Sequence, residues 1–599
     1  MPGAVDVCLA VPRLELDRPF TYLLPEGIEA PTGTLVSVPF HGRTVKGWVL
    51  GPAAEVPARV LRVRRLLSRV PMFGPADLRL YRWVSERYVA PLGAVIGRAH
   101  PPRVAGEEDR DPLPAAPMAV PSPPRVLEGY GGGSDLLAAC RSGSGTFVLR
   151  SLPDHEAAAC VEAVAACLAG GRDAVVLVPE AEPLPATARA VAEAFGAAVL
   201  VFAGGEPRER YRMWLDLLGG RYRVAVGTRP AVFAPLRDPG LVWVNREAHP
   251  GHREERAPYH HVREVAAARA RLESAACVLA AHSPSAAAAA LADRGEARLV
   301  RASRQRERAA APLVETARPQ DEDRSPRLGT LVAGSRSAFL LVSRRGYGVA
   351  RVCRACGEPA RCEVCGGPVA VRRGRAACTV CGADGRCPSC GGTSFGLERG
   401  GTERVREWAA RITGREVALV DSGDRAERPA GLVVGTAAGV KDFGSVRLGL
   451  VAVLDADRAR RRAGLTAPEQ VLATWFEAAA WAGARSEGGR VLVQTRDPGD
   501  PAVQALVRWD PWHFHRAERR RLEEAGFPPG FPVFRVIGNS GLPERLRAAD
   551  PMTLLDSGDR DQTVCLVTVR PGGLERFRAT ILDLVSEGVV RRVEAEPQL

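Results

Sequence analysis

The sequence predicts a multidomain α/β protein with an N-terminal β-rich domain, two parallel-sheet lobes, an inserted cysteine-rich module and a small α+β C-terminal domain. The chain has 599 residues, which is too long for a single hydrophobic core. Short apolar runs alternate with helical stretches through its middle, the pattern of βαβ units and a parallel sheet. Eight of its 14 cysteines fall within residues 353–390. Together these observations predict several domains of different kinds.

Residues 1–104 are expected to form the β-rich domain. Their short apolar runs are bounded by proline and glycine and end in a helical pattern: VDVCLAVP, FTYLLP, GTLVSVPF and VKGWVLG, then LRLYRWVSERYVA. Residues 105–130 are rich in proline and charge, so we expect a linker there.

The two lobes are predicted from two series of apolar strands. The first lobe, residues 131–315, has strands in TFVLRSL, DAVVLVPE, AAVLVFAG, YRVAVGT, GLVWVN and ACVLAAHS. The second lobe, residues 316–352 and 391–500, has strands in SAFLLVS, EVALVDS, GLVVGTA, LGLVAVLD and RVLVQT. Residues 353–390 interrupt this lobe after its first strand, and residues 501–599 read as a smaller α+β domain.

The eight clustered cysteines predict two zinc ions. They form four C-x-x-C pairs, each followed by glycine: Cys353 and Cys356, Cys362 and Cys365, Cys378 and Cys381, Cys387 and Cys390. Two such turns supply four thiolates to one tetrahedral, structural site. The zinc would fold a segment that has almost no apolar core of its own. The other six cysteines have apolar neighbours and are expected to pack in cores: Cys8, Cys140, Cys160, Cys167, Cys277 and Cys565.

Four cysteine pairs can be combined into two sites in three ways. Combining sequence neighbours leaves only five residues between Cys356 and Cys362 for the chain to reverse. We favour a nested arrangement with an outer and an inner site, while the alternatives stay open. The outer site (zinc 1) is Cys353, Cys356, Cys387 and Cys390, and the inner site (zinc 2) is Cys362, Cys365, Cys378 and Cys381, spanned by a hairpin through PVAVRRGRAA.

Composition and charge exclude some classes of protein. The chain is 46% hydrophobic and lacks the uninterrupted apolar stretch of a membrane helix, so we expect no membrane partner and a cytoplasmic location. Its net charge of +13 suits a polyanion. Lysine occurs only at Lys46 and Lys441, however, and arginine use on this scale is typical of a GC-rich genome, so charge alone does not decide nucleic-acid binding.

Two parallel-sheet lobes in a basic chain suggest a nucleic-acid motor, but the ATP-site residues are absent. A motor needs a phosphate loop with lysine and an acidic pair for Mg²⁺. The only glycine-rich candidate is Gly143, Ser144, Gly145 and Thr146, which has no lysine nearby. The strand GLVWVN ends in Asn245 and Arg246 where the acidic pair would be. We therefore interpret residues 143–146 as a degenerate or structural loop and predict no nucleotide-binding residues.

Several motifs resemble the PriA family, the primosomal replication-restart proteins (primosomal protein N′). They span nearly the whole chain: RPFTYLLP, YRWVSERYVAPLGAVIG, VAVGTRPAVFAPLRDPGLVWV, RRGYGVARVCRACG, GGTERVREWAA, LVVGTAAGVKDFGSVRLGLVAVLDAD and FPPGFPVFRVIG. The resemblance implies an N-terminal domain that binds the 3′ end of a DNA strand, two helicase lobes, and a zinc module that engages DNA and partner proteins. The short linker leaves no room for the family's winged-helix domain.

When the family's motifs are compared with this sequence residue by residue, the zinc-binding cysteines match best and the ATP-site motifs match least. The family's Phe-Asp-Tyr run at the 3′-end pocket is Phe20, Thr21 and Tyr22 here, and a family lysine falls at Arg62. Phe20, Tyr22 and Arg62 are thus candidate DNA contacts. The GSGKT, DEEH and Q-x-x-G-R-A-G-R motifs correspond to residues 143–146, 245–248 and 477–484. The first lacks its lysine, the second has Asn245 and Arg246 in place of its Asp-Glu pair, and the third lacks both arginines. This pattern resembles the actinobacterial branch with degenerate helicase motifs.

The resemblance implies a zinc-containing replication-restart component of the primosome that binds stalled or abandoned forks and helps reload the replicative helicase. We expect no ATPase or helicase activity. The implied partners are forked or single-strand/double-strand junction DNA, other primosome proteins, the replicative helicase and single-stranded DNA-binding protein, in the nucleoid. One alternative is an active ATP-dependent 3′-to-5′ helicase with divergent motifs, which DNA-stimulated ATP hydrolysis would distinguish. Another is an interaction module whose zinc region binds only protein or RNA.

Overall fold

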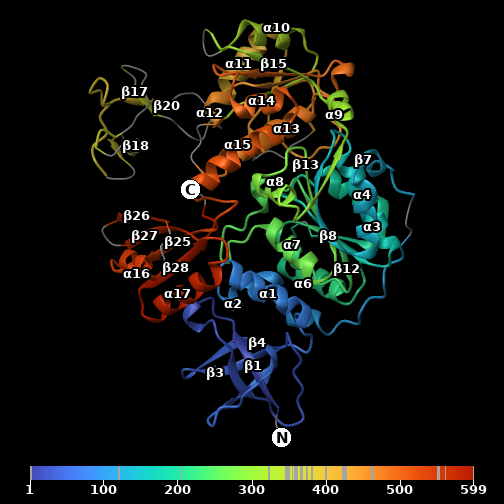
Figure 1. Ribbon diagram of the computed structural model, residues 1–599, viewed down its shortest axis with the longest axis vertical. Coiled ribbons are helices and arrows are strands. Elements are labelled where there is room, and N and C mark those ends of the chain that lie inside the picture. Colours follow the sequence, from blue (N-terminus) through green and yellow to red (C-terminus); the bar gives the residue numbers. More distant parts are fainter. Residues whose placement is uncertain are drawn as a thin grey trace.

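The computed structural model describes residues 3–118, 122–202, 204–320, 324–343, 351–353, 355, 362–364, 369–372, 375–378, 382–397, 401–420, 428–460, 464–549, 553–559 and 562–597. The N-terminal sheet lies at one end of the molecule, the two lobes above it, and the cysteine module and C-terminal sheet to one side (Figure 1). The expected multidomain α/β organisation, with an N-terminal β-rich domain and two parallel sheets, is confirmed.

The N-terminal domain is a six-stranded sheet followed by two helices. In the order β5-β2-β1-β4-β3-β6, the strands are β5 (Leu61–Arg62), β2 (Phe20–Leu23), β1 (Ala4–Leu9), β4 (Arg43–Pro52), β3 (Leu35–Phe40) and β6 (Arg65–Leu66). All neighbours are antiparallel except β2 and β5. Apolar residues alternate along β1 and β2, so one face of the sheet is a small core around Val7 and Tyr22. Helices α1 (Pro75–Arg87) and α2 (Leu92–Ala99) then lead toward the first lobe.

The first lobe is built on an eight-stranded sheet. In the order β10-β11-β9-β12-β13-β8-β14-β7, its strands are β10 (Val199–Phe202), β11 (Val224–Gly227), β9 (Asp173–Leu177), β12 (Pro239–Asn245), β13 (Ala276–Ala281), β8 (Gly145–Arg150), β14 (Arg298–Ala302) and β7 (Tyr130–Gly131). Every pair is parallel except β14 and β7. Its helices are α3 (Gly133–Ser142), α4 (Glu156–Ala169), α5 (Ala186–Phe195), α6 (Pro207–Leu218), α7 (Val262–Leu272), α8 (Ala286–Asp293) and α9 (Arg304–Ala310). The central strands are buried throughout because helices cover both sheet faces.

The second lobe has a six-stranded, all-parallel sheet. In the order β15-β24-β23-β16-β22-β21, its strands are β15 (Leu313–Ala317), β24 (Arg490–Gln494), β23 (Leu450–Val453), β16 (Ala338–Leu341), β22 (Leu432–Gly435) and β21 (Val417–Val420). Its helices are α10 (Pro326–Gly334), α11 (Gly401–Thr413), α12 (Ala456–Arg460), α13 (Ala467–Ala480), α14 (Pro501–Val507) and α15 (Pro511–Glu524).

Two boundaries differ from those expected. The second sheet begins at Leu313, so the boundary placed at residue 315 falls inside β15. Residues 501–514 pack their apolar side chains, including Leu506 and Phe514, into the core of the second lobe rather than into the C-terminal domain. The sequence pattern of an amphipathic helix shows that one face is buried, but it does not show which neighbouring core that face packs against.

The C-terminal domain is an antiparallel sheet in the order β26-β27-β25-β28, with two helices. Its elements are β25 (Val533–Gly538), α16 (Leu542–Ala549), β26 (Thr553–Asp559), β27 (Gln562–Thr568), α17 (Leu574–Ser586) and β28 (Val590–Ala595). Phe534 and Phe577 pack together with ring centroids 4.6 Å apart. Apolar residues of this domain share one core with α1 and α7, so the C-terminal sheet is fixed to both the N-terminal domain and the first lobe.

Polar contacts join the same three parts. Arg87 of α1 lies 2.8 Å from Glu264 of α7 and 2.9 Å from Glu596 near the C-terminus. Residues of the expected linker also contact the first lobe, since the buried Glu107 carboxylate pairs with Arg212 of α6 at 2.9 Å. The N-terminal domain is therefore tied to the rest of the molecule on more than one side.

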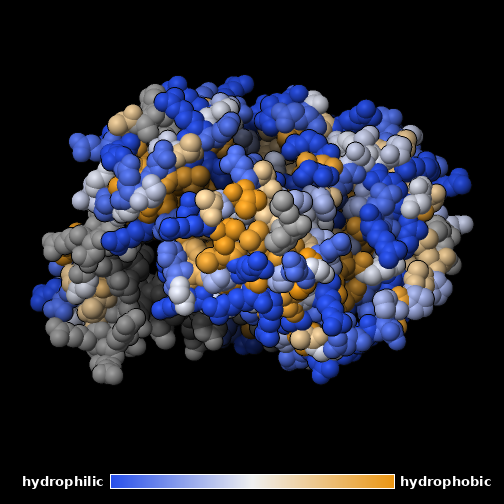
Figure 2. All heavy atoms as spheres, turned by 90° about the horizontal axis from the view of Figure 1, so that it is seen from below, coloured by the Kyte–Doolittle hydropathy of each residue, from blue (hydrophilic) through white to orange (hydrophobic). Residues whose placement is uncertain are grey.

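Hydrophilic side chains cover most of the face shown in Figure 2, with hydrophobic ones gathered near its middle. Three of the exposed large hydrophobic residues belong to the N-terminal domain: Ile28, Val56 and Leu61. None of the described helices combines the length and apolarity that a membrane crossing would require.

Candidate functional site

The two lobes meet at the carboxyl ends of β8, β12 and β13, the edge at which open parallel sheets bind ligands. The facing elements of the second lobe are α13 and residues 436–447, which follow β22. We call this region the inter-lobe cleft. It is where a two-lobed motor would hold ATP.

The degenerate loop Gly143, Ser144, Gly145 and Thr146 does not lie in this cleft. It connects α3 to the amino end of β8, whereas a phosphate loop must connect the carboxyl end of a strand to a helix N-terminus. Gly143 has φ +80°, and a Cβ atom there would lie 2.4 Å from the Ser274 carbonyl oxygen. Its role is therefore to end α3 with a left-handed residue, at a position too crowded for a side chain. The interpretation of residues 143–146 as the remnant of the phosphate loop is therefore wrong.

The strand-to-helix connection after β8 is Ser151–His155, and α4 begins at Glu156. This connection contains neither glycine nor lysine. A carboxylate thus stands at the first residue of the helix whose N-terminus would otherwise attract phosphate. Burial raises the pKa of the Glu156 carboxyl well above its ordinary value, and the nearby Glu477 adds to the rise.

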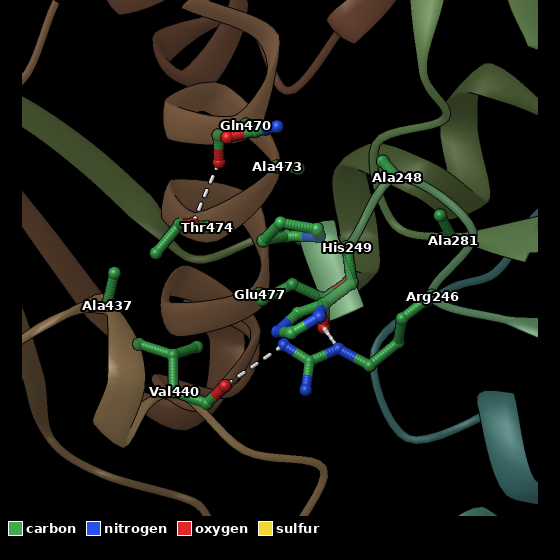
Figure 3. Close-up of a pocket in the computed structure, with 11 residues that line it drawn as sticks. Arg246, Ala248, His249, Ala281, Ala437, Val440, Gln470, Ala473, Thr474 and Glu477 are labelled. Carbon is green, nitrogen blue, oxygen red and sulfur yellow. Dashed lines mark hydrogen bonds and ion pairs between the residues drawn. The ribbon is translucent and has the colours of Figure 1, made fainter. Parts of the chain in front are cut away.

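Arg246 lies at the carboxyl end of β12, as the sequence predicts, and crosses the cleft. Its backbone has φ +50°, and its side chain is buried at 3% exposure. The guanidinium Nε lies 3.1 Å from a Glu477 carboxylate oxygen of α13, and Nη2 donates to the Val440 carbonyl oxygen at 3.2 Å (Figure 3). A guanidinium here takes the place of the acidic pair that would bind the Mg²⁺ of a magnesium–triphosphate complex.

Three further contacts hold the cleft closed. The Asp442 carboxylate accepts hydrogen bonds from the backbone N–H and the hydroxyl of Thr187, at 3.1 and 2.8 Å. Lys441 pairs with Glu180. Arg447 lies 2.8 Å from Asp154 in the connection after β8. In the described structure, the cleft is therefore an interface of ion pairs between the lobes.

The cysteine module brings together three cysteines of the outer site. The Sγ atoms of Cys353, Cys387 and Cys390 lie within 4.8 Å of one another, those of Cys353 and Cys390 at 3.4 Å, close enough to share a metal ion. A Cβ on Gly392 would lie 3.0 Å from the Cys353 sulfur, so the absence of a side chain leaves room for this grouping. The residues present fit a metal. The fourth expected ligand, Cys356, lies outside the described residues.

The inner set is only partly described. Cys362 and Cys378 are buried in the same small core as Cys353 and Cys387, whereas Cys365 and Cys381 lie outside the described residues. The expected hairpin is present as β18 (Val369–Arg372) and β19 (Arg375–Cys378), beside the pair β17 (Arg351–Cys353) and β20 (Phe395–Leu397). The Val364 N–H donates to the Cys362 sulfur at 3.4 Å, as expected of a metal-binding cysteine turn. The six remaining cysteines are all buried, which confirms the prediction that they pack in cores.

The three candidate DNA contacts of the N-terminal domain divide between the two faces of its sheet. Tyr22 is buried at 4% exposure and donates to the Pro39 carbonyl oxygen at 3.0 Å, so its ring does not reach the surface. Phe20 packs edge-on against Phe40, with the Arg18 guanidinium 5.0 Å from its ring centroid. Arg62 is exposed on β5, beside Leu23 of β2. Tyr22 is accordingly a core residue, not a direct DNA contact.

A carboxylate that the sequence reasoning missed lies next to Thr21. Asp6 of β1 is its direct cross-strand partner, and the Thr21 hydroxyl donates to Asp6 Oδ1 at 2.8 Å. Because paired residues share a face, Asp6 and Thr21 lie on the side opposite the Tyr22 core. Strand pairing was the missing information, since 15 residues separate the two along the chain.

Comparisons with known proteins extend over nearly the whole chain. The family model described as "3'DNA-binding domain (3'BD)" matches residues 6–101. The protein named "Probable replication restart protein PriA" of Mycobacterium leprae (strain TN) is 33% identical over 598 residues, covering 93% of this chain and 91% of that protein. The protein of the same name in Mycobacterium tuberculosis (strain CDC 1551 / Oshkosh) is 32% identical, covering 91% and 88%.

A more distant relative has the same name, and a solved structure gives a much weaker match. "Replication restart protein PriA" of Treponema pallidum (strain Nichols) is 26% identical over 566 residues, covering 88% of this chain and 85% of that protein. The solved "Structure of RecG bound to three-way DNA junction" is 14% identical with a TM-score of 0.36, covering 62% of this chain and 43% of that one. That likeness is too weak to support an argument.

Proposed function

This chain belongs to the PriA family of replication restart proteins, and from that premise we propose that it binds stalled or abandoned DNA forks and helps reload the replicative helicase without hydrolysing ATP. The buried Arg246–Glu477 pair is the observation that supports the absence of ATP hydrolysis. It occupies the cleft with a cation and closes it from the opposite lobe, where Mg²⁺ and triphosphate would have to enter. The protein would then hold branched DNA as a scaffold.

DNA affinity in this proposal comes mainly from arginine contacts to phosphate. Arg62 and the other exposed arginines of the N-terminal domain supply positive charge, and fork shape supplies selectivity. Asp6 and Thr21 together offer a carboxylate and a hydroxyl on the outer sheet face. We propose that this pair accepts the 3′-hydroxyl of the DNA strand in place of a carboxylate at residue 21.

Zinc forms the second part of the proposal. Cys353, Cys356, Cys387 and Cys390 would hold one ion, and Cys362, Cys365, Cys378 and Cys381 a second. The grouping of Cys353, Cys387 and Cys390 supports the outer site. Each ion would supply folding energy to a module with few apolar residues and is not expected to react. The module would contact DNA and partner proteins of the primosome, the replicative helicase and single-stranded DNA-binding protein among them, at the nucleoid in the cytoplasm.

Fork binding by the full-length protein tests this function. We expect tighter binding to a fork with a 3′-hydroxyl leading-strand end than to one ending in 3′-phosphate, and a fall in affinity of roughly tenfold or more between 50 and 200 mM salt. Asp6→Asn should remove the preference for the 3′-hydroxyl, whereas Glu29→Gln, at an exposed position of the same domain, should keep it. Equal binding of forked and blunt duplex DNA by the unaltered protein would refute the proposal.

A further inference from the structure

Three side chains that can bind metal meet in the inter-lobe cleft, far from the cysteine module in sequence. Glu156 begins α4, His282 follows β13, and Glu477 lies on α13 of the other lobe. His282 Nε2 lies 3.8 Å from a Glu156 carboxylate oxygen and 3.9 Å from a Glu477 carboxylate oxygen. One ligand atom from each lies within 4.8 Å of the other two. The group therefore bridges the lobes.

The histidine is held with one nitrogen turned toward the two carboxylates. Its Nδ1 lies 3.1 Å from the Ser151 carbonyl oxygen, which can only accept a hydrogen bond. Nδ1 therefore carries the proton, and Nε2 presents its lone pair to the group. A backbone carbonyl that fixes the far nitrogen in this way is the usual support of a metal-binding histidine.

Glu156 lacks the partners that a buried carboxylate needs. It is 8% exposed, and among the described residues its Oε1 atom has no hydrogen-bond partner. The distance of 3.8 Å from Oε2 to His282 Nε2 is too long for a hydrogen bond. A buried carboxyl oxygen left without a partner costs free energy, and a bound cation would supply that partner.

The ion pairs of the cleft leave Glu156 without a cationic partner. Arg246 pairs with Glu477, Lys441 with Glu180 and Arg447 with Asp154. Asp442 accepts two hydrogen bonds from Thr187. Among the described residues, the basic group that faces Glu156 is the His282 imidazole at 3.8 Å, and no lysine or arginine pairs with this carboxyl. Glu156 is therefore the acidic group of this cleft whose partner a cation could supply.

We propose that Glu156, His282 and Glu477 bind one divalent transition-metal ion of the zinc or manganese type, which joins the two lobes. Two carboxylates and one imidazole form a ligand set for Zn²⁺ or Mn²⁺. A tetrahedral ion with bonds of about 2.1 Å sets its ligand atoms about 3.4 Å apart. The two carboxylate oxygens at 3.8 and 3.9 Å from His282 Nε2 therefore need to approach that nitrogen by about half an ångström or less. This site contains no thiolate and does not depend on DNA binding.

The ion would hold the two lobes together, as bound nucleotide does in a two-lobed motor. It would connect the start of α4 to α13 and hold the cleft in one closed arrangement, while the Arg246–Glu477 pair stays in place. Binding that requires both lobes to be in place stabilises the closed arrangement by mass action.

Manganese titration of the full-length protein tests the proposal. The protein is prepared with its cysteine-bound zinc retained and other metals removed, and free Mn²⁺ is followed by electron paramagnetic resonance. We expect one saturable Mn²⁺ per chain, displaced by one equivalent of Zn²⁺, and a rise in melting temperature on binding. Thiolate sites do not favour Mn²⁺, so the cysteine module should not contribute.

Two matched variants make the result specific. Glu156→Gln keeps the size of the side chain and replaces the carboxyl group by an amide, a weaker metal ligand. It should fold without metal yet bind Mn²⁺ at least tenfold more weakly and lose the rise in melting temperature. Glu128→Gln, at an exposed carboxylate of the first lobe outside the cleft, should bind as the unaltered protein does. Absence of saturable binding in the unaltered protein, or equal binding by Glu156→Gln, would overturn the proposal.

Discussion

Removing the Arg246 side chain tests whether the inter-lobe cleft is held shut by ion pairs. Arg246→Ala deletes the contact of 3.1 Å to Glu477 and the hydrogen bond of 3.2 Å to the Val440 carbonyl oxygen. The substitution leaves Glu477, itself only 12% exposed, without its counter-charge. Breaking one partner of such a buried pair costs about 3–5 kcal/mol. We expect a loss of unfolding free energy near the lower end, about 3 kcal/mol, because Glu477 retains some contact with water.

The assay is urea unfolding, followed by tryptophan fluorescence, of protein that keeps its cysteine-bound zinc and is free of other metals. Trp243 of the first lobe and Trp475 of the second lie in the cores on either side of the cleft, so both lobes contribute to the signal. The control is Arg327→Ala, which breaks the more exposed Arg327–Glu315 pair within the second lobe, with contacts of 2.7 Å. That substitution should cost less than about 1 kcal/mol.

A comparison of the two variants decides the matter. If Arg246→Ala costs no more than Arg327→Ala, the cleft is not held by this pair and the reasoning fails. A double substitution of Arg246 and Glu477 by alanine should recover part of the loss, since neither charge is then left buried alone.

Two other predictions concern the cysteine module and acid stability. Cys387→Ser should lose about one zinc per chain by elemental analysis, whereas Cys140→Ser, in the core of the first lobe, should lose none; retention of all zinc by Cys387→Ser would contradict the outer site. Burial lowers the pKa of His252 and of His260 to about 4, so the folded protein binds fewer protons than the unfolded chain below pH 6.5. The contribution of the two histidines to the free energy of unfolding is fully present above that pH and is lost as pH falls toward 4. The loss is about 2 kcal/mol for each histidine between pH 7 and 5. His252→Asn should flatten the dependence of melting temperature on pH, while a change at the exposed His41 should leave it as it is.

The strands of both lobes could be predicted because their physical signal is local. Runs such as DAVVLVPE and GLVWVN are apolar on both faces, and the structure buries every residue of β9 and β12. The position of Arg246 followed from the same reasoning, since the residue after a buried parallel strand lies at the ligand-binding edge.

The candidate site could be predicted only in part because its partners are distant in sequence. Residues 143–146 were assigned to the phosphate loop by composition, but composition does not say at which end of a strand a turn lies. Glu156, His282 and Glu477 come from three separate elements, and only the folded chain brings them together. Asp6 beside Thr21 is a third case, in which strand pairing placed a carboxylate that the local run lacks.

Phosphate release from ATP is the most direct test of the central claim that this protein binds forks without using nucleotide as fuel. It should be measured with homogeneous full-length protein, with Mg²⁺ and saturating forked DNA whose binding is confirmed in the same sample. We expect a rate equal to that of the DNA alone, unchanged in Arg246→Ala. A rate that rises with fork concentration, follows the protein through a second purification step and falls in Arg246→Ala would contradict the account.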